Sequence, residues 1–231
     1  MITRIKNYEK RPPSRDAKKV YIICEGKGTE PDYFHFFEDR SSNLQLVVIP
    51  PDSGTDPLKL MDLAKRIFLN EESSKYQLDY LSNDTVWFVI DTDTWASEGK
   101  IKTLRTFCQN NNSGIAEKYS ELKAYPAWRV AQSNPSFEIW LYYHVFSARP
   151  NQDEVDSFPT FKSFVGNAIS GGFDFQSDPV RVDKAVENAK ATFKRDDDGE
   201  LALYSTEVYE LAEVIIPLFK QQLSRLKGKM K

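Results

Sequence analysis

Four short apolar runs occur along the chain, at residues 20–24, 44–49, 86–90 and 125–131. Their β-branched and aromatic side chains are typical of buried strands, although the last run is the weakest. Polar segments long enough to contain a helix separate successive runs. Because parallel neighbouring strands need long connections, this alternation predicts a mainly parallel sheet.

Helical patterns occupy these connections. One helix is expected to begin at Thr29, whose hydroxyl can cap it, and Pro31 suits its first turn. A second helix begins at Pro57 and has an apolar face that extends to Phe68. A third helix is expected near residues 101–110.

After residue 150 the chain has no convincing strand pattern. The residues from Phe137 to His144 are apolar on most sides of a helix, which predicts that this helix is buried. Three amphipathic stretches follow, at 161–169, 182–193 and 208–226. The expected fold class is α/β, with a mainly parallel sheet of about four strands flanked by helices and a helical C-terminal extension.

This pattern predicts three parts along the chain. Residues 1–19 form a polar N-terminal leader, residues 20–147 form the α/β core, and residues 148–231 form the helical extension packed on that core. A chain of 231 residues can bury one substantial hydrophobic core. No internal repeat competes with this organisation.

Charge is distributed unevenly, although the formal net charge is only -3. Residues 1–19 contain seven Lys or Arg residues against Glu9 and Asp16, and residues 217–231 contain five and no acid. The middle of the chain is therefore strongly acidic. Basic ends are often inert and solvated, but they also suit contact with a polyanion such as nucleic acid.

The cysteines and the hydropathy of the chain indicate its cellular compartment. Cys24 and Cys108 lie in apolar or helical segments, without the spacing of a disulfide framework or a zinc site. No apolar run approaches the roughly 20 residues that cross a bilayer, and the N-terminus does not resemble a signal peptide. We expect a cytoplasmic protein without a membrane partner, and the oligomeric state stays open.

Acidic residues stand where two of the predicted strands end. Glu25 follows the first strand, and Asp91 and Asp93 follow the third. If these strands are neighbours, as in a flavodoxin-like order, the three carboxylates converge at one edge of the sheet. Their repulsion demands a cation, and Mg²⁺ accepts such oxygen ligands, with Mn²⁺ able to substitute. Glu138, on an otherwise apolar helix, is a fourth candidate ligand or a partner of Arg129.

Four further residues are candidates for substrate binding. Lys27 and Arg129 suit contacts with phosphate, although solvated surface charge is the more common role for either residue alone. Ser133 and Asn134 follow the fourth strand and are expected to face the same crevice, or Asn134 caps the next helix together with Pro135.

Other chemistries find less support in the sequence. The two His residues are separate from any Cys pair, and no phosphate-binding G-x-x-x-x-G-K-[ST] loop occurs. Residues 89–94 also form an apolar run followed by Asp-Thr-Asp-Thr, which resembles the D-x-D-x-T motif of haloacid-dehalogenase-like phosphatases, where Asp91 would be the nucleophile. That chemistry needs a second acidic pair at a strand end, and Asp196, Asp197 and Asp198 follow a helix instead.

The segment Cys-Glu-Gly-Lys-Gly-Thr-Glu-Pro-Asp-Tyr-Phe at residues 24–34 closely resembles the N-terminal signature of RloB-like proteins. Later blocks match in order, at 90–93, 133–141 and 204–208. One departure concerns the last block, which usually has Asn-Pro-Ser-Thr, where this chain has Leu203-Tyr204-Ser205-Thr206. We therefore expect no role for this Ser-Thr pair beyond helix capping.

The resemblance implies a Toprim/Rossmann-like fold, in which a Glu after the first strand and an Asp-x-Asp after a later strand bind Mg²⁺. Glu25, Asp91 and Asp93 occupy those positions. It also implies a nuclease of bacterial anti-phage defence, often encoded beside an ATPase partner. The leading hypothesis is hydrolysis of DNA or RNA, with Asp91 and Asp93 on Mg²⁺ and Glu25 as general base. The rival is a non-catalytic sensor that uses the same site to regulate the ATPase.

Overall fold

The computed structural model describes residues 13–52, 54–92, 95–120 and 125–230. Its centre is a five-stranded sheet with the order β2-β1-β3-β4-β5. The strands are β1 (Lys18–Cys24), β2 (Leu44–Ile49), β3 (Thr85–Asp91), β4 (Trp128–Asn134) and β5 (Ser205–Thr206). The first four run parallel, and β5 is antiparallel to β4. The predicted α/β fold with a mainly parallel sheet is confirmed.

The fourth strand lies further along the chain than its apolar run predicts. It covers Trp128–Asn134 instead of residues 125–131. Pro126 has no N–H to give to a ladder. At the other end, the polar residues from Gln132 onward continue the strand because β3 pairs with them on one side and β5 on the other. A hydropathy pattern cannot register such pairing.

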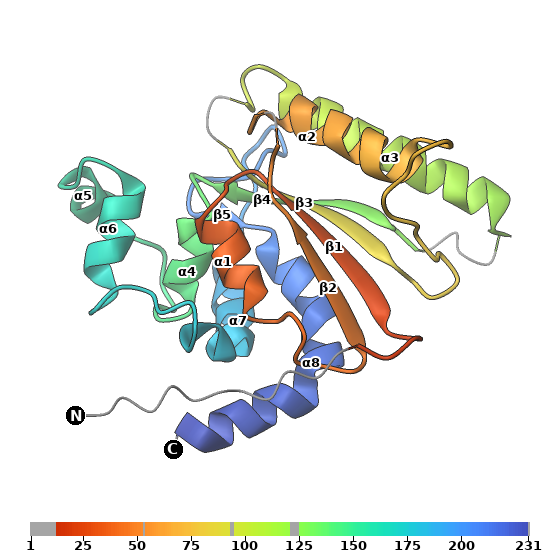
Figure 1. The fold of residues 1–231 in the computed structure, drawn as a ribbon. Coiled ribbons are helices and arrows are strands. Elements are labelled where there is room, and N and C mark those ends of the chain that lie inside the picture. The colour runs from red at the N-terminus through yellow and green to blue at the C-terminus, as the bar shows by residue number, and fades with distance from the viewer. Residues whose placement is uncertain (1–12, 53, 93–94, 121–124, 231) are drawn as a thin grey trace.

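Helices cover both faces of the sheet (Figure 1). On one face, α2 (Pro57–Ala64), continued by a π-helical turn, packs beside α3 (Lys100–Lys118) over one buried cluster of apolar side chains. On the other face lie α1 (Thr29–His35), α4 (Glu138–Tyr143), α7 (Val182–Thr192) and α8 (Val208–Met230). The expected cap at Thr29 is wrong, because Gly28 is the N-cap and no side chain caps α1.

The segment after residue 147 shares the core of the sheet. One apolar cluster includes Val20 and Trp87 of the strands together with Val208 and Phe219 of α8. This segment also supplies β5, so the expectation that it contains no strand is wrong at Ser205–Thr206. α5 (Gln152–Asp156) and α6 (Phe161–Ala168) extend away from the sheet, as a lobe beside α4 (Figure 1). A 3-10 turn at Asp178–Arg181 precedes α7. Within the described residues, no helix has the length and apolar character needed to cross a membrane.

Candidate active site

A cleft of about 600 Å³ opens where β1 and β3 end. Residues 26–30, after β1, form one side of its lining, and residues 135–138, after β4, form another. Asp91 at the end of β3 and residues 160–162 at the start of α6 complete it. The carboxyl ends of parallel strands are the usual position of a binding crevice in such a sheet.

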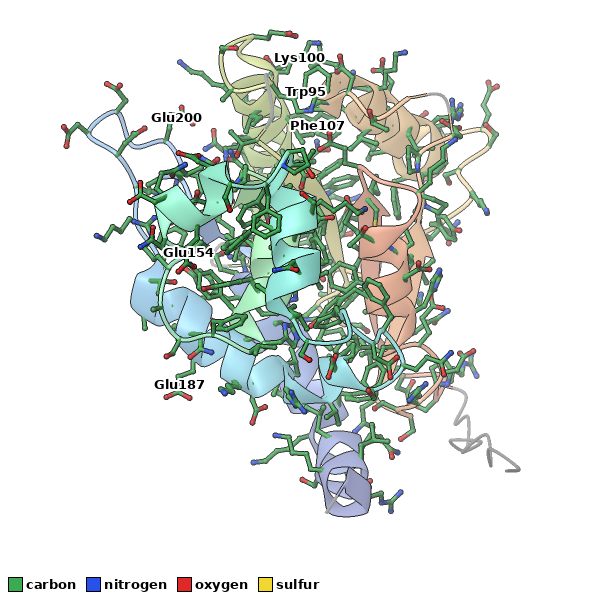
Figure 2. The ribbon with its side chains drawn as sticks, turned by 90° about the vertical axis from the view of Figure 1, so that its left-hand side faces the viewer. Trp95, Lys100, Phe107, Glu154, Glu187 and Glu200 are labelled. Carbon is green, nitrogen blue, oxygen red and sulfur yellow. The ribbon has the colours of Figure 1, made fainter. Side chains whose placement is uncertain are left out.

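Glu25 connects the ends of β1 and β3. Its Oε2 accepts a hydrogen bond from the Asp91 backbone N–H at 2.8 Å, and its Oε1 accepts one from the Trp95 indole at 2.8 Å. Trp95 is itself covered by Lys100, whose Nζ lies 4.5 Å from the ring centroid (Figure 2). Glu25 is only 6% exposed, and the cleft lining begins at the next residue, Gly26. Its carboxylate therefore fixes the backbone at Asp91.

Asp91 is half-buried and lines the cleft. Its Oδ1 accepts a hydrogen bond from the backbone N–H of Phe137 at 2.8 Å, so this carboxylate also holds the turn that leads into α4. The structure thus brings Glu25 and Asp91 together, as adjacent ends of β1 and β3 require. Asp93 lies outside the described residues.

Glu138 is the first residue of α4, and it reaches the cleft with 8% of its surface exposed. Its Oε2 accepts a hydrogen bond from the Ser136 hydroxyl at 2.7 Å. Lys162 Nζ lies 3.5 Å from its Oε1. The expected pairing of Glu138 with Arg129 is wrong, since Arg129 forms its ion pair with Glu210 of α8.

Glu30 is a third cleft carboxylate, and the sequence interpretation missed it. It is 6% exposed, and its Oε1 accepts a hydrogen bond from the Gly26 N–H at 3.1 Å. Burial raises the pKa of Glu30 above its ordinary value, and the negative charge of Glu138 raises it further. A Cβ at position 26 would lie 2.4 Å from Glu30 Oε2, so only glycine permits this close approach. The available signal was an acid five residues after Glu25, in the first turn of the predicted helix.

Lys162 was also missed. Its Nζ donates to the Thr29 hydroxyl at 3.1 Å and so connects α6 to the start of α1. The two residues are 133 positions apart, and no local pattern predicts their contact. Lys27, the predicted phosphate contact, is exposed and lines the cleft opposite this α6 segment.

Three predicted substrate-binding residues lie outside the cleft lining. Ser133 is fully buried, and its hydroxyl shares a hydrogen bond of 2.8 Å with that of Thr206. Asn134 donates to the Leu201 carbonyl at 2.6 Å and does not cap α4, whose N-cap is Phe137. Arg129 precedes Ser133 by four residues, roughly 13 Å along a strand. Its guanidinium lies over Trp87, far from the strand end.

Arg129 instead belongs to a second polar site, of about 300 Å³, which we call the arginine groove. It is lined by Arg105, Arg129, Arg195, Glu207 and Glu210 together with uncharged neighbours. Glu207 is 2% exposed and accepts hydrogen bonds from Arg105 at 2.7 Å, from Arg195 at 2.5 Å and from the Gln132 backbone N–H at 3.1 Å.

The arginine groove is connected to the cleft through Gln132. Arg105 donates to the Gln132 side-chain oxygen at 2.9 Å, and the Gln132 amide donates to the Thr92 hydroxyl at 2.9 Å. Thr92 in turn donates to the Ser133 carbonyl at 2.8 Å. This chain of contacts holds the residue after Asp91. The Thr206 hydroxyl accepts a hydrogen bond from the N–H of Val208, the first residue of α8, at 3.2 Å, and it also pairs with Ser133.

The cleft has a donor set of hard oxygen atoms. Its carboxylates are Glu30, Asp91 and Glu138, and its cations are Lys27 and Lys162. Among the described residues, no three His, Cys, Asp or Glu side chains form a group ready to hold a metal ion. Mg²⁺, however, usually binds one or two carboxylates and completes its shell with water and phosphate oxygens. Asp91 and Glu138 are two such carboxylates in the lining of one cleft.

Comparison with known proteins gives one match. A family model described as RloB-like protein matches residues 20–215. No curated protein and no solved structure matches the chain. The matched region includes the end of β1, the end of β3 and the turn into α4, which are the three segments that carry the carboxylates of the site. Because the match covers most of the chain, the protein belongs to the RloB-like family.

Proposed function

We propose that the cleft hydrolyses phosphodiester bonds of a polynucleotide with the help of Mg²⁺, and that this activity serves bacterial anti-phage defence. One observation carries the proposal. Glu25 binds the backbone of Asp91 at the ends of two adjacent strands, and Asp91 shares one cleft with Glu138. The arrangement is compatible with the Toprim-like site that the sequence motifs imply.

The cleft has more negative than positive side chains, with three carboxylates against two lysines. Without a cation, such a cleft would repel a phosphodiester. In the proposal Asp91 and Glu138 hold Mg²⁺, Asp93 adds a ligand as predicted from the sequence, and Mn²⁺ can substitute. When bound, the ion supplies neutralisation of the phosphate oxygens and of the departing alkoxide.

The chain's own residues supply positioning and proton transfer. Two N–H donors orient the Glu25 carboxylate, which keeps the end of β3 in place. Glu25 is also the proposed general base that takes a proton from the attacking water. Lys27 and Lys162 are the cations available to the phosphates on either side of the scissile bond.

Incubation of the purified protein with Mg²⁺ or with EDTA tests the proposal. The substrates are tRNA, single-stranded DNA, plasmid and p-nitrophenyl phosphate. We expect cleavage of at least one polymer with Mg²⁺ and none with EDTA, and we expect Asp91→Ala to abolish it. Asp62→Ala, at an exposed position of α2, is the matched control. Full cleavage by Asp91→Ala would reject the assignment.

A non-catalytic sensor is the second candidate, and one observation favours it. Both oxygens of Glu25 accept hydrogen bonds from protein N–H groups, as in a purely structural carboxylate. In that case the protein binds nucleotide or nucleic acid and regulates an ATPase partner. Binding without cleavage in the same incubation would favour the sensor.

The phosphatase reading has less support. Asp196, Asp197 and Asp198 are exposed in a turn, where the Asp196 N–H donates to the Glu200 carbonyl at 3.0 Å, instead of ending an apolar strand. Hydrolysis of p-nitrophenyl phosphate alone would restore it. We further propose a cytoplasmic location, where the free, buried thiols of Cys24 and Cys108 remain reduced.

A further inference from the structure

We infer that Phe161 and Lys162, at the start of α6, form a subsite for one unpaired nucleotide, so that the cleft takes single-stranded rather than duplex polynucleotide. This inference rests on the proposed function for the chemistry next to the subsite. It depends on the α5–α6 lobe, which Figure 1 shows projecting beside α4. The RloB-like motifs lie in other segments and give no role to this lobe.

The lobe forms a wall of the cleft. Thr160, Phe161 and Lys162 line it together with the segment from Gly26 to Glu30. Lys162 spans the space between the two, with its Nζ 3.1 Å from Thr29 Oγ1 and 3.5 Å from Glu138 Oε1. A nucleotide that enters beside Asp91 therefore meets α6 on its way.

Phe161 gives this wall an aromatic surface that is held in place. Its ring stacks on Tyr204, with centroids 5.5 Å apart and an interplanar angle of 29°. The Tyr204 hydroxyl donates to Gln152 Oε1 of α5 at 2.9 Å, which fixes the ring beneath. Phe164 supports Phe161 from within α6, at 5.9 Å between centroids. A ring fixed in this way can stack on a base with little loss of conformational freedom.

The aromatic surface selects for unpaired bases. In a duplex both faces of each base are already stacked, so a base must leave the helix before it can use Phe161. The cleft volume of about 600 Å³ lies in the range of small-ligand sites. Lys27 and Lys162 are exposed, and they supply ammonium groups for the phosphates that flank the stacked base. The aromatic surface, the cleft volume and the two lysines together favour binding of one extruded or unpaired nucleotide.

Fluorescence anisotropy tests the subsite separately from cleavage. The probes are a single strand of about 12 nucleotides, the same sequence as a blunt duplex, and the mononucleotide. All have phosphorothioate linkages or ends that resist hydrolysis, and all are measured with Mg²⁺. We expect the single strand to bind at least tenfold more tightly than the duplex, since stacking of each base contributes that order of affinity. Equal binding of strand and duplex would overturn the inference.

Variants locate the effect. Phe161→Ala is expected to weaken single-strand binding roughly tenfold, and Phe161→Trp is expected to restore it. Phe158→Ala is the matched control, because Phe158 packs on Phe164 in the same lobe but does not line the cleft. Lys162→Ala should weaken binding and reduce its salt dependence, whereas Lys190→Ala, which also removes a lysine paired with a glutamate, should not. An unchanged affinity in Phe161→Ala, or an equal loss in Phe158→Ala, contradicts the subsite.

The outcomes separate the two proposals. Cleavage of strand and duplex at equal rates, unaffected by Phe161→Ala, would refute the subsite and leave the nuclease proposal standing. Selective single-strand binding that depends on Phe161, without cleavage under any condition, would refute the nuclease proposal and support the subsite. Mononucleotide binding as tight as that of the single strand would show a free nucleotide as the ligand and overturn the polynucleotide assignment.

Discussion

The cleft and the arginine groove both contain buried carboxylates, but these carboxylates differ in the cationic partners that surround them. In the groove, Glu207 is 2% exposed and accepts hydrogen bonds from two arginines and a backbone N–H. Arg129 likewise pairs with Glu210. Each negative charge there has a guanidinium partner, as expected for an ion-pair network that supports the fold.

Among the residues that line the cleft, three carboxylates stand against two lysines. Glu30 and Glu138 are 6% and 8% exposed, and Lys162 forms an ion pair with Glu138 at 3.5 Å. The Lys162 side chain is 71% exposed, so water screens this pair strongly. A buried carboxylate whose pKa is raised by burial and by a neighbouring negative charge, such as Glu30, is a candidate for a functional site. The comparison therefore favours a structural role for the groove and supports the proposal that the cleft is the functional site.

Asp91→Asn is the sharpest test of that division, and it has the largest expected effect. The amide keeps an oxygen that can accept from the Phe137 N–H, but it removes the negative charge. We expect the cleavage rate to fall by about 10³-fold, or roughly 4 kcal/mol of transition-state stabilisation. The melting temperature should change little, because the contact to α4 survives. Asp62→Asn, whose side chain is 69% exposed, should change neither quantity.

Glu207→Gln tests whether the ion pairs of the arginine groove stabilise the fold. The change leaves Arg105 and Arg195 without their shared carboxylate and weakens the hold on Gln132. Breaking a buried pair costs about 3–5 kcal/mol, and solvent access to both arginines reduces this to roughly 3 kcal/mol of unfolding free energy. Urea denaturation measures the loss. Glu213→Gln, which removes an exposed partner of Lys190, should stay within about 0.5 kcal/mol. A comparable small loss in Glu207→Gln would remove the distinction between the two sites.

The sequence predicted the half of the cleft that depends on strand order. Apolar runs locate β1 and β3, and a parallel sheet brings their ends together, so Glu25 and Asp91 follow from local pattern and simple topology. The bounds of β2, Leu44–Ile49, match the predicted run. These features were accessible because burial on both faces of a strand leaves a continuous apolar signal.

The other half depends on tertiary contacts that leave no local signal. Lys162 meets Thr29 across 133 residues, and Arg105 meets Glu207 across 102. Arg129 was expected at the cleft because its charge suits phosphate, but its position near the start of β4 directs it to α8. The two-residue β5 is too short and too polar for a periodicity argument. Long-range pairing, not residue type, decides such positions.

Gly26→Ala sharpens the comparison within the cleft. The added Cβ would lie 2.4 Å from Glu30 Oε2, so the carboxylate must leave the Gly26 N–H. We expect cleavage to fall about tenfold and the unfolding free energy to drop by roughly 1 kcal/mol, the contribution of one hydrogen bond. Gly28→Ala is the matched control, because a Cβ there meets nothing within 4 Å. Equal effects in both variants would show that the Glu30 position does not matter.

Glu30→Gln has the smallest expected effect. This effect is a change in the free energy of unfolding, and its sign follows from the raised pKa of Glu30. Burial and the charge of Glu138 raise the pKa of Glu30 in the folded state, so the folded protein binds this proton more tightly than the unfolded chain does. The stabilisation that protonated Glu30 gives the folded state is fully present below the ordinary pKa of a glutamate. It is lost as the pH rises through the raised pKa of Glu30 in the folded state. The neutral glutamine retains an oxygen for the Gly26 N–H but does not titrate.

Glu30→Gln should therefore gain stability relative to the parent chain as pH increases from 4 to 8, which urea unfolding at several pH values measures. Repeating the measurement with Mg²⁺ tests whether the negative charge of the cleft, unlike that of the arginine groove, attracts a cation. A cation bound among the cleft carboxylates would stabilise the parent chain more than the variant and shrink the difference at pH 8. Glu213→Gln should not show the Mg²⁺ effect, because its carboxylate is exposed and does not line the cleft. If Mg²⁺ leaves the difference in unfolding free energy between Glu30→Gln and the parent chain unchanged, the excess negative charge of the cleft does not attract a divalent ion.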